Sequence, residues 1–283
     1  MIGKFLSPKN DFAFKHIFGS ERHSAILIHF LNDILEFTGD KLIEKVTFLK
    51  PNQDPEVLAQ KYSLVDVLCQ DQKGRQYIIE MQVAKRAGFE KRAQYYAAKT
   101  YSRQLNDGEN YHDLKEVIFL AITDFVMFPD KKVYKSNHVI LDQATYTRDL
   151  KDFSFTFLEL PKFTKNIDEL TSMVDKWAYF FKHAEETNEK ELPQIVGEDK
   201  IIEQAYEALN RFSMTEVELN SYDREIKREL DTVAVLLNAK LEGKSEEQIE
   251  MAKRMLSDKV DDAIILKYTA LSKEALQSLK EAQ

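Results

Sequence analysis

The segments Tyr62-Ser-Leu-Val-Asp-Val-Leu-Cys69 and Arg75-Gln-Tyr-Ile-Ile-Glu-Met-Gln-Val83 flank Asp71-Gln-Lys-Gly74 and predict a β-hairpin. Both segments are rich in β-branched and aromatic residues, which favour strands. Gly74 can adopt the left-handed backbone conformation that ends a three-residue hairpin loop. We therefore expect the loop to be Gln72–Gly74, and the loop to fix the strand register.

This register places two carboxylates directly opposite each other, Asp66 and Glu80, and pairs Leu64 with Gln82. Asp and Glu are uncommon in strands, and an unpaired buried carboxylate is costly. Residues two apart share one face of a strand, so we expect both acids on one face with Cβ atoms roughly 5 Å apart. Like charges at that distance destabilise the strand pair, so the two acids need a common explanation.

A divalent cation between the two carboxylates would turn this repulsion into binding. Two carboxylates completed by water suit Mg²⁺ or Mn²⁺, and the Met81 carbonyl can add a third protein oxygen. Two alternatives stay open, in which the acids share one proton or each is bonded to its own Arg or Lys. A slip of one residue in the loop would send the acids to opposite faces and remove the site.

A helix predicted over about 89–105 follows the second strand and carries basic residues. The segment 85–104 holds six basic residues and one acidic residue. Residues at helical spacing on one face are Arg92, Tyr96, Lys99 and Arg103. Phosphodiester cleavage needs a metal that activates water and basic residues on the flanking phosphates. A solvated amphipathic helix is the alternative explanation.

The rest of the chain predicts a mixed sheet between helices, then an almost wholly helical region. Helices are expected over 12–18 (capped by Asn10 or Asp11), 21–37 and 167–184. Strands are expected near 45–49, 116–123, 133–141 and 153–160, and turn residues predict a loop over 51–56. Pro193–Gly197 is the predicted linker, followed by three or four helices, one opened by the capping-box pattern Ser245-Glu-Glu-Gln.

Composition and motifs exclude several protein classes. The single cysteine, Cys69, cannot form an internal disulfide or a Cys-based zinc site. No apolar stretch approaches the ~18 residues of a membrane-spanning helix. The chain lacks a GxxxxGK[ST] phosphate loop, a GxGxxG turn, an HExxH zinc motif and a GxSxG nucleophile elbow. We expect a soluble, cytoplasmic globular protein.

The net charge of −8 is unevenly distributed. Residues 185–283 hold 23 acidic and 14 basic residues, whereas residues 1–184 hold 25 acidic and 26 basic residues. The first part can therefore offer a phosphate-binding groove, while the acidic C-terminal part is poorly suited to reading DNA. For residues 195–283 we expect a regulatory, dimerisation or weak DNA-binding role, including an acidic tail that covers the basic groove.

Three motifs in order resemble a known nuclease family. Asp66…Glu80-Met81-Gln82 resembles the D…(D/E)xK core of PD-(D/E)XK nucleases, with Gln in place of Lys. Pro8-Lys-Asn-Asp-Phe-Ala-Phe-Lys-His-Ile-Phe-Gly19 and the stretch from Arg92 to Tyr111 are similar to further signatures of the Rpn family. These are recombination-promoting nucleases, also called PD-(D/E)XK nuclease family transposases, and the likeness covers roughly residues 5–185.

The resemblance implies a restriction-endonuclease-like α/β core over 1–190, with a mixed central sheet flanked by helices, and an all-α region over 195–283. It implies a Mg²⁺-dependent endonuclease for double-stranded DNA, associated with recombination or transposition, with Mn²⁺ as a substitute for Mg²⁺. By position, the catalytic residues would be Asp66, Glu80 and Gln82, with the metal at Asp66, Glu80 and Met81. Phosphate contacts would come from Arg92, Lys99 and Arg103. Supporting residues would be Asp11, Lys15 and Tyr96.

Gln82 lacks the positive charge that a Lys would bring to the phosphate, although it can orient water by hydrogen bonds. Lys15, Lys85 or Arg86 would supply that charge, or turnover is slow. Two other functions stay open: a catalytically weak or inactive DNA- or protein-binding module on the same fold, and an acid–base enzyme such as a glycosidase. A homodimer is a further open option.

Overall fold

The computed structural model describes residues 3–50, 52–53, 63–105, 108, 110–258 and 260–281. The chain divides into two compact units, the first ending at Tyr222 and the second beginning at Asp223. The first unit contains the sheet, and the described residues of the second unit are almost wholly helical. The predicted fold class, a mixed sheet flanked by helices and followed by an all-α region, is confirmed.

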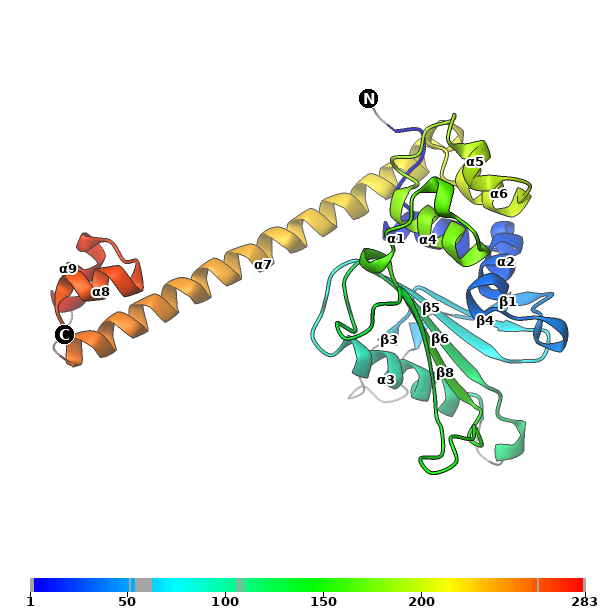
Figure 1. Cartoon of the computed structure of the whole chain (residues 1–283), viewed down its shortest axis with the longest axis horizontal. Helices are drawn as coiled ribbons and strands as arrows, with labels where there is room; N and C mark the ends of the chain where they lie inside the picture. Colours follow the sequence, from blue (N-terminus) through cyan, green and yellow to red (C-terminus); the bar gives the residue numbers. More distant parts are fainter. Residues whose placement is uncertain are drawn as a thin grey trace. The chain divides into compact units, whose positions relative to one another are not determined.

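A six-stranded mixed sheet forms the centre of the first unit, with strand order β1-β4-β5-β6-β8-β7 (Figure 1). Its strands are β1 (Val46–Phe48), β4 (Val67–Asp71), β5 (Gln76–Gln82), β6 (Val117–Thr123), β7 (Lys135–Val139) and β8 (Phe153–Glu159). The central strands β5, β6 and β8 run parallel, and the outer strands pair antiparallel. Strand β6 is buried along its whole length, as its continuous apolar sequence predicts.

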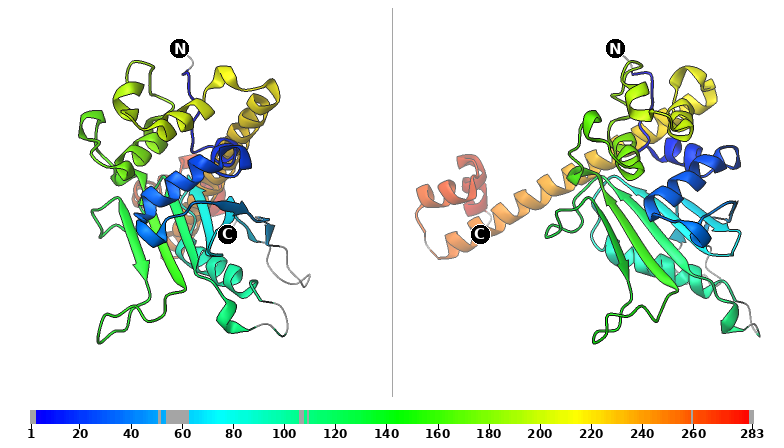
Figure 2. Two further views of the ribbon diagram at one scale, coloured as in Figure 1. Left: turned by 90° about the vertical axis from the view of Figure 1, so that its right-hand side faces the viewer. Right: turned by 45° about the vertical axis from the view of Figure 1, so that its right-hand side comes forward.

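Helices cover both faces of the sheet (Figure 1, Figure 2). On one face α3 (Phe89–Ser102) packs through Phe89, Ala93 and Ala97 into the smaller of the two cores of the first unit. The larger core lies on the other face, under α1 (Asp11–Phe18), α2 (Ser24–Leu35), α4 (Met173–His183) and α6 (Lys200–Ala208). Asn10 caps α1, as predicted.

The hairpin of β4 and β5 has the predicted register. Val67 pairs with Ile79, and the Asp71 N–H donates to the Arg75 carbonyl across the loop. Gly74 ends this loop with φ of 82°, the left-handed conformation that glycine favours. The loop length and its glycine therefore fix which residues of the two strands are opposite each other.

The predicted pairing of Leu64 with Gln82 is wrong. The chain bends at Asp66, and the ladder of β4 with β5 ends at Val67. Leu64 instead belongs to β3 (Ser63–Leu64), which pairs with β2 (Asn52–Gln53) in a separate two-stranded sheet. Of the predicted loop over 51–56, residues 52–53 are therefore strand, and the others lie outside the described residues.

Two predictions for the helical part are also wrong. Pro193–Gly197 is not a linker, because α5 (Leu192–Val196) occupies it with Ile195 buried, and a proline fits the first turn of a helix. Ser245 does not open a helix, because it lies inside α7 (Glu216–Ser257). A single glycine at position 243 costs a helix only about 1 kcal/mol and does not end it.

The second unit ends in two short helices, α8 (Asp262–Thr269) and α9 (Lys273–Glu281), around a small core. Ala270 joins them with φ of 55°, in the left-handed region that favours glycine. None of the described helices in the chain combines the length and apolar sequence needed to cross a bilayer.

We expect Ala270→Gly to stabilise the second unit by about 0.5–1 kcal/mol. The left-handed conformation costs an L-residue about 1–2 kcal/mol, and the greater flexibility of unfolded glycine offsets part of that gain. Amide hydrogen exchange across α8 and α9 in the full chain should slow. The matched control Ala263→Gly, in the first turn of α8, should speed it, and a change of the same sign in both variants would contradict this account.

Candidate functional site

The structure brings the two predicted acids close enough that the charge of Asp66 adds to the effect of burial in raising the pKa of Glu80, and Asp66 lies just outside the ladder of β4 and β5. Leu68 and Ile78 lie in the smaller core next to α3, whereas their neighbours along the strands face the larger core. Glu80 follows the same alternation as Ile78, and it lies beside Ala121 of β6 in that core. Asp66 precedes β4 by one residue and accepts a 2.9 Å hydrogen bond at Oδ2 from the Met81 N–H.

Glu80 is a buried acid with an unsatisfied oxygen. The residue is 5% exposed, and among the described residues its Oε1 has no hydrogen-bond partner. Burial raises the pKa of Glu80 to about 8; the charge of Asp66 adds to the increase, and Arg92 opposes it. A cation bound to the free oxygen of such a buried carboxylate would stabilise its charged form.

Lys15, from the N-terminal stretch Pro8–Gly19 that resembles the nuclease family, lies beside Asp66. The Lys15 ammonium lies 3.6 Å from Asp66 Oδ1 and 2.7 Å from Asp11 Oδ1. Burial nevertheless raises the pKa of Asp66 to about 6, against the hydrogen bond from Met81 and the charge of Lys15. Burial lowers the pKa of Lys15, but the two aspartates raise it more, so this ammonium stays charged. Lys15 thus balances Asp66 only in part.

Gln82, the third motif residue, is held at both ends of its amide. Its Nε2 donates a 2.9 Å hydrogen bond to the Ala84 carbonyl, and its Oε1 accepts one from Arg92 Nη2. The Arg92 guanidinium lies 4.8 Å from the Phe89 ring centre and 5.8 Å from that of Tyr96. Among the described residues its buried Nε has no partner. Arg92 therefore brings a positive charge to the third motif position.

This link between Gln82 and Arg92 was missed by sequence reasoning. The sequence suggested Lys15, Lys85 or Arg86 as the source of charge. Lys15 does reach the acids, whereas Lys85 points its ammonium at the Val126 carbonyl, 3.4 Å away, and Arg86 is exposed. Helical spacing placed Arg92 on a basic face, but spacing alone cannot say which strand residue that face meets.

The other residues of the predicted basic face have different surroundings. Tyr96 is partly buried, and burial raises its pKa, with smaller effects from Arg92, Glu80 and Asp66. Lys99 is only 9% exposed, and its ammonium lies 6.0 Å from the Tyr95 ring centre. Arg103 is exposed at the C-terminal end of α3. The phosphate contacts assigned to Lys99 and Arg103 stay predictions.

The donor set at the acids fits a divalent cation. Within the described part of the chain, no group of three or more His, Cys, Asp and Glu side chains could hold a metal ion. The charged ligands predicted for this site are Asp66 and Glu80, and the neighbouring peptide of Met81 offers a carbonyl. Mg²⁺ commonly binds through one or two carboxylates and keeps several waters. The unsatisfied Glu80 Oε1 is the observation that favours this fit.

In metal-free buffer we expect Glu80→Gln to stabilise the protein by about 1–3 kcal/mol at pH 8.5. The folded state keeps its proton on Glu80 between the usual pKa of 4.5 and about 8. Protonated Glu80 therefore makes its full contribution to the stability of the wild type below pH 4.5, and this contribution is lost as the pH rises through 8. Urea unfolding in EDTA should show a gain at pH 8.5 and little at pH 5. For the exposed control Glu90→Gln, the difference in unfolding free energy from the wild type should be the same at both pH values.

The chain matches one family of known proteins. A family model described as PD-(D/E)XK nuclease family transposase matches residues 8–239, most of the chain. The matched range includes Lys15, Asp66, Glu80 and Arg92, which the fold places around one site. Searches of curated proteins and of solved structures gave no significant match.

Proposed function

The chain belongs to the PD-(D/E)XK nuclease family transposases, and from this membership we propose that it is a Mg²⁺-dependent endonuclease of double-stranded DNA. Its role would lie in recombination or transposition in the cytoplasm. The observation that carries the proposal is the pair of the half-buried Asp66 and the buried Glu80, whose Oε1 has no partner among the described residues. Lys15 faces Asp66, and Arg92 donates to Gln82. Mn²⁺ would substitute for Mg²⁺.

Asp66, Glu80 and the Met81 carbonyl would hold the metal. When bound, a divalent ion polarises a phosphoryl oxygen and lowers the pKa of a water. Asp66 is oriented for this task, because the Met81 N–H fixes one of its oxygens and Lys15 faces the other. Lys15 acts here as a positioning residue that takes its own orientation from Asp11.

Arg92 would stabilise the negative charge that develops on the phosphate in the transition state. Its guanidinium is fixed between the Gln82 amide and the ring of Phe89, so little freedom is lost when it meets a phosphate. Gln82 would then act through Arg92, because its own amide already has a partner at each end.

The connection from β5 to α3 offers a basic surface next to the acids. Residues 84–87 are exposed and include Lys85 and Arg86, and the exposed Lys91 follows in the first turns of α3. Cations on such a surface bind the DNA backbone without reading sequence. We assign these residues to phosphate contacts, together with Arg103.

The proposal is tested by nicking of supercoiled plasmid in Mg²⁺, in Mn²⁺ and in EDTA. We expect nicking with either ion and none in EDTA. The neutral Gln82 favours a second candidate, a weak or inactive DNA-binding module on the same fold. That module would bind DNA in EDTA, lose affinity steeply with salt, and nick under no divalent ion.

A further inference from the structure

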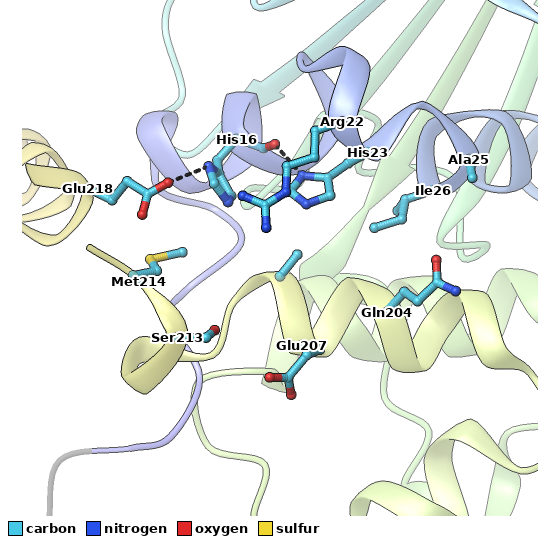
Figure 3. Close-up of a pocket in the computed structure, with 11 residues that line it drawn as sticks. His16, Arg22, His23, Ala25, Ile26, Gln204, Glu207, Ser213, Met214 and Glu218 are labelled. Carbon is cyan, nitrogen blue, oxygen red and sulfur yellow. Dashed lines mark hydrogen bonds and ion pairs between the residues drawn. The ribbon is translucent and has the colours of Figure 1, made fainter.

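A second candidate site lies beside α1, and it is lined by His16, the residue that follows Lys15. A cavity of about 390 Å³ opens there within the first unit (Figure 3). One wall comes from α1, the adjoining turn at 21–23 and the start of α2; the other comes from α6, residues 213–214 and the start of α7. Small-molecule sites begin at about this volume. No role in the proposed cleavage accounts for this cavity.

The first wall gathers three side chains that bind anions. These are His16, Arg22 and His23 (Figure 3). The two imidazole centres are 5.1 Å apart. His23 Nδ1 lies 2.9 Å from the His16 carbonyl and donates to it, so Nε2 is the ring nitrogen left for a ligand, and it donates to a phosphate in the imidazolium form of the ring. Arg22 is exposed and needs no large movement to meet a ligand.

Glu218 also lines the cavity, but other groups already engage its carboxylate. Glu218 Oε1 lies 3.8 Å from His16 Nδ1, and Oε2 accepts hydrogen bonds from the N–H and hydroxyl of Thr215. The Glu218 carboxylate is therefore partly neutralised by hydrogen bonds from Thr215, which lies outside the cavity lining. The wall formed by His16, Arg22 and His23 remains suited to a phosphate group.

The opposite wall has a different chemistry. Gln204 and Glu207 of α6 offer an amide and a carboxylate, which can bind the ring N–H groups and amines of a nucleobase. Ile26 and Met214 add apolar surface that suits the face of a flat ring. A phosphate-binding end and a ring-binding end thus lie within one cavity of nucleotide size.

We propose that this cavity binds a nucleoside monophosphate, with the phosphate at His16, Arg22 and His23 and the base at Gln204 and Glu207. The site is separate from the acid pair, but both use α1. Lys15 of this helix faces Asp66, and its neighbour His16 lines the cavity. The ligand therefore contacts the same helix that orients the acid pair.

Calorimetric titration of the full chain in EDTA tests the proposal with three probes: adenosine and guanosine 5′-monophosphates, inorganic phosphate, and the parent nucleosides. We expect the monophosphates to bind more tightly than phosphate alone. Arg22→Ala should weaken both by about tenfold or more, because it removes a charge-assisted contact. Gln204→Ala should weaken the monophosphates and leave phosphate binding unchanged.

Lys132→Ala, an exposed change outside the cavity, is the control and should alter nothing. Thermal melting of each variant shows that it is folded. The proposal is overturned if no monophosphate binds at concentrations up to about 10 mM. It is equally overturned if Arg22→Ala binds like the wild type, or if nucleosides bind as well as their monophosphates. Because the titration contains no metal or DNA, its outcome is independent of whether the protein cleaves DNA.

Discussion

Asp66→Asn and Glu80→Gln are each expected to lower plasmid nicking in Mg²⁺ by about 10³-fold. A metal ion contributes several kcal/mol to transition-state stabilisation, and each variant removes one of its two charged ligands. The substitutions keep the side-chain size, and Glu80→Gln is expected to stabilise the metal-free fold. Loss of nicking would therefore report lost metal chemistry and not unfolding. Nicking rates under single-turnover conditions measure the effect.

A second readout separates the metal from other roles of the acids. Mn²⁺ should raise the melting temperature of the wild type, because it binds only the folded state, and should do so much less for either variant. The control Glu36→Gln, which removes an exposed carboxylate paired with Lys135, should keep both nicking and the Mn²⁺ response. Full nicking by Asp66→Asn or Glu80→Gln would refute the assignment of these acids as metal ligands.

The hairpin register was predictable because it depends on local chemistry. Gly74 fixes the length of the loop, and the alternation of side chains then fixes the face on which Glu80 lies. The break at Asp66 was not predictable in this way. It depends on the pairing of Leu64 with Asn52, a contact between segments that no single turn specifies.

The surroundings of the acids depend on packing that a sequence pattern does not contain. The rotation of α3 is set by the burial of Phe89, Ala93 and Ala97 against the sheet, and this rotation brings Arg92 to Gln82. The spacing of basic residues gave their common face but not their exposure, so Lys99 is buried where a solvated phosphate contact was expected. The cavity beside α1 could not be predicted either, because α1 and α6, which form its walls, are far apart in the sequence.

Arg92→Ala is expected to lower the rate of nicking by about 10²-fold at saturating DNA. The loss of one fixed group that stabilises transition-state charge commonly has this effect. Gln82→Ala should cost about tenfold, because the guanidinium of Arg92 loses the amide that holds it. The control Arg86→Ala should weaken DNA binding and its salt dependence, yet leave the rate at saturating DNA unchanged, because Arg86 is exposed away from the Gln82 amide.

A rescue distinguishes charge from structure. The double variant Arg92→Ala with Gln82→Lys returns a positive charge to the third motif position on a different side chain. If Arg92 supplies the charge that the motif lysine would bring, the double variant should nick about tenfold or more faster than Arg92→Ala alone. If Arg92 only packs against Phe89 and Tyr96, the added lysine cannot replace it, and the double variant should be no faster. That second result would refute the charge assignment while leaving Asp66 and Glu80 as the metal ligands.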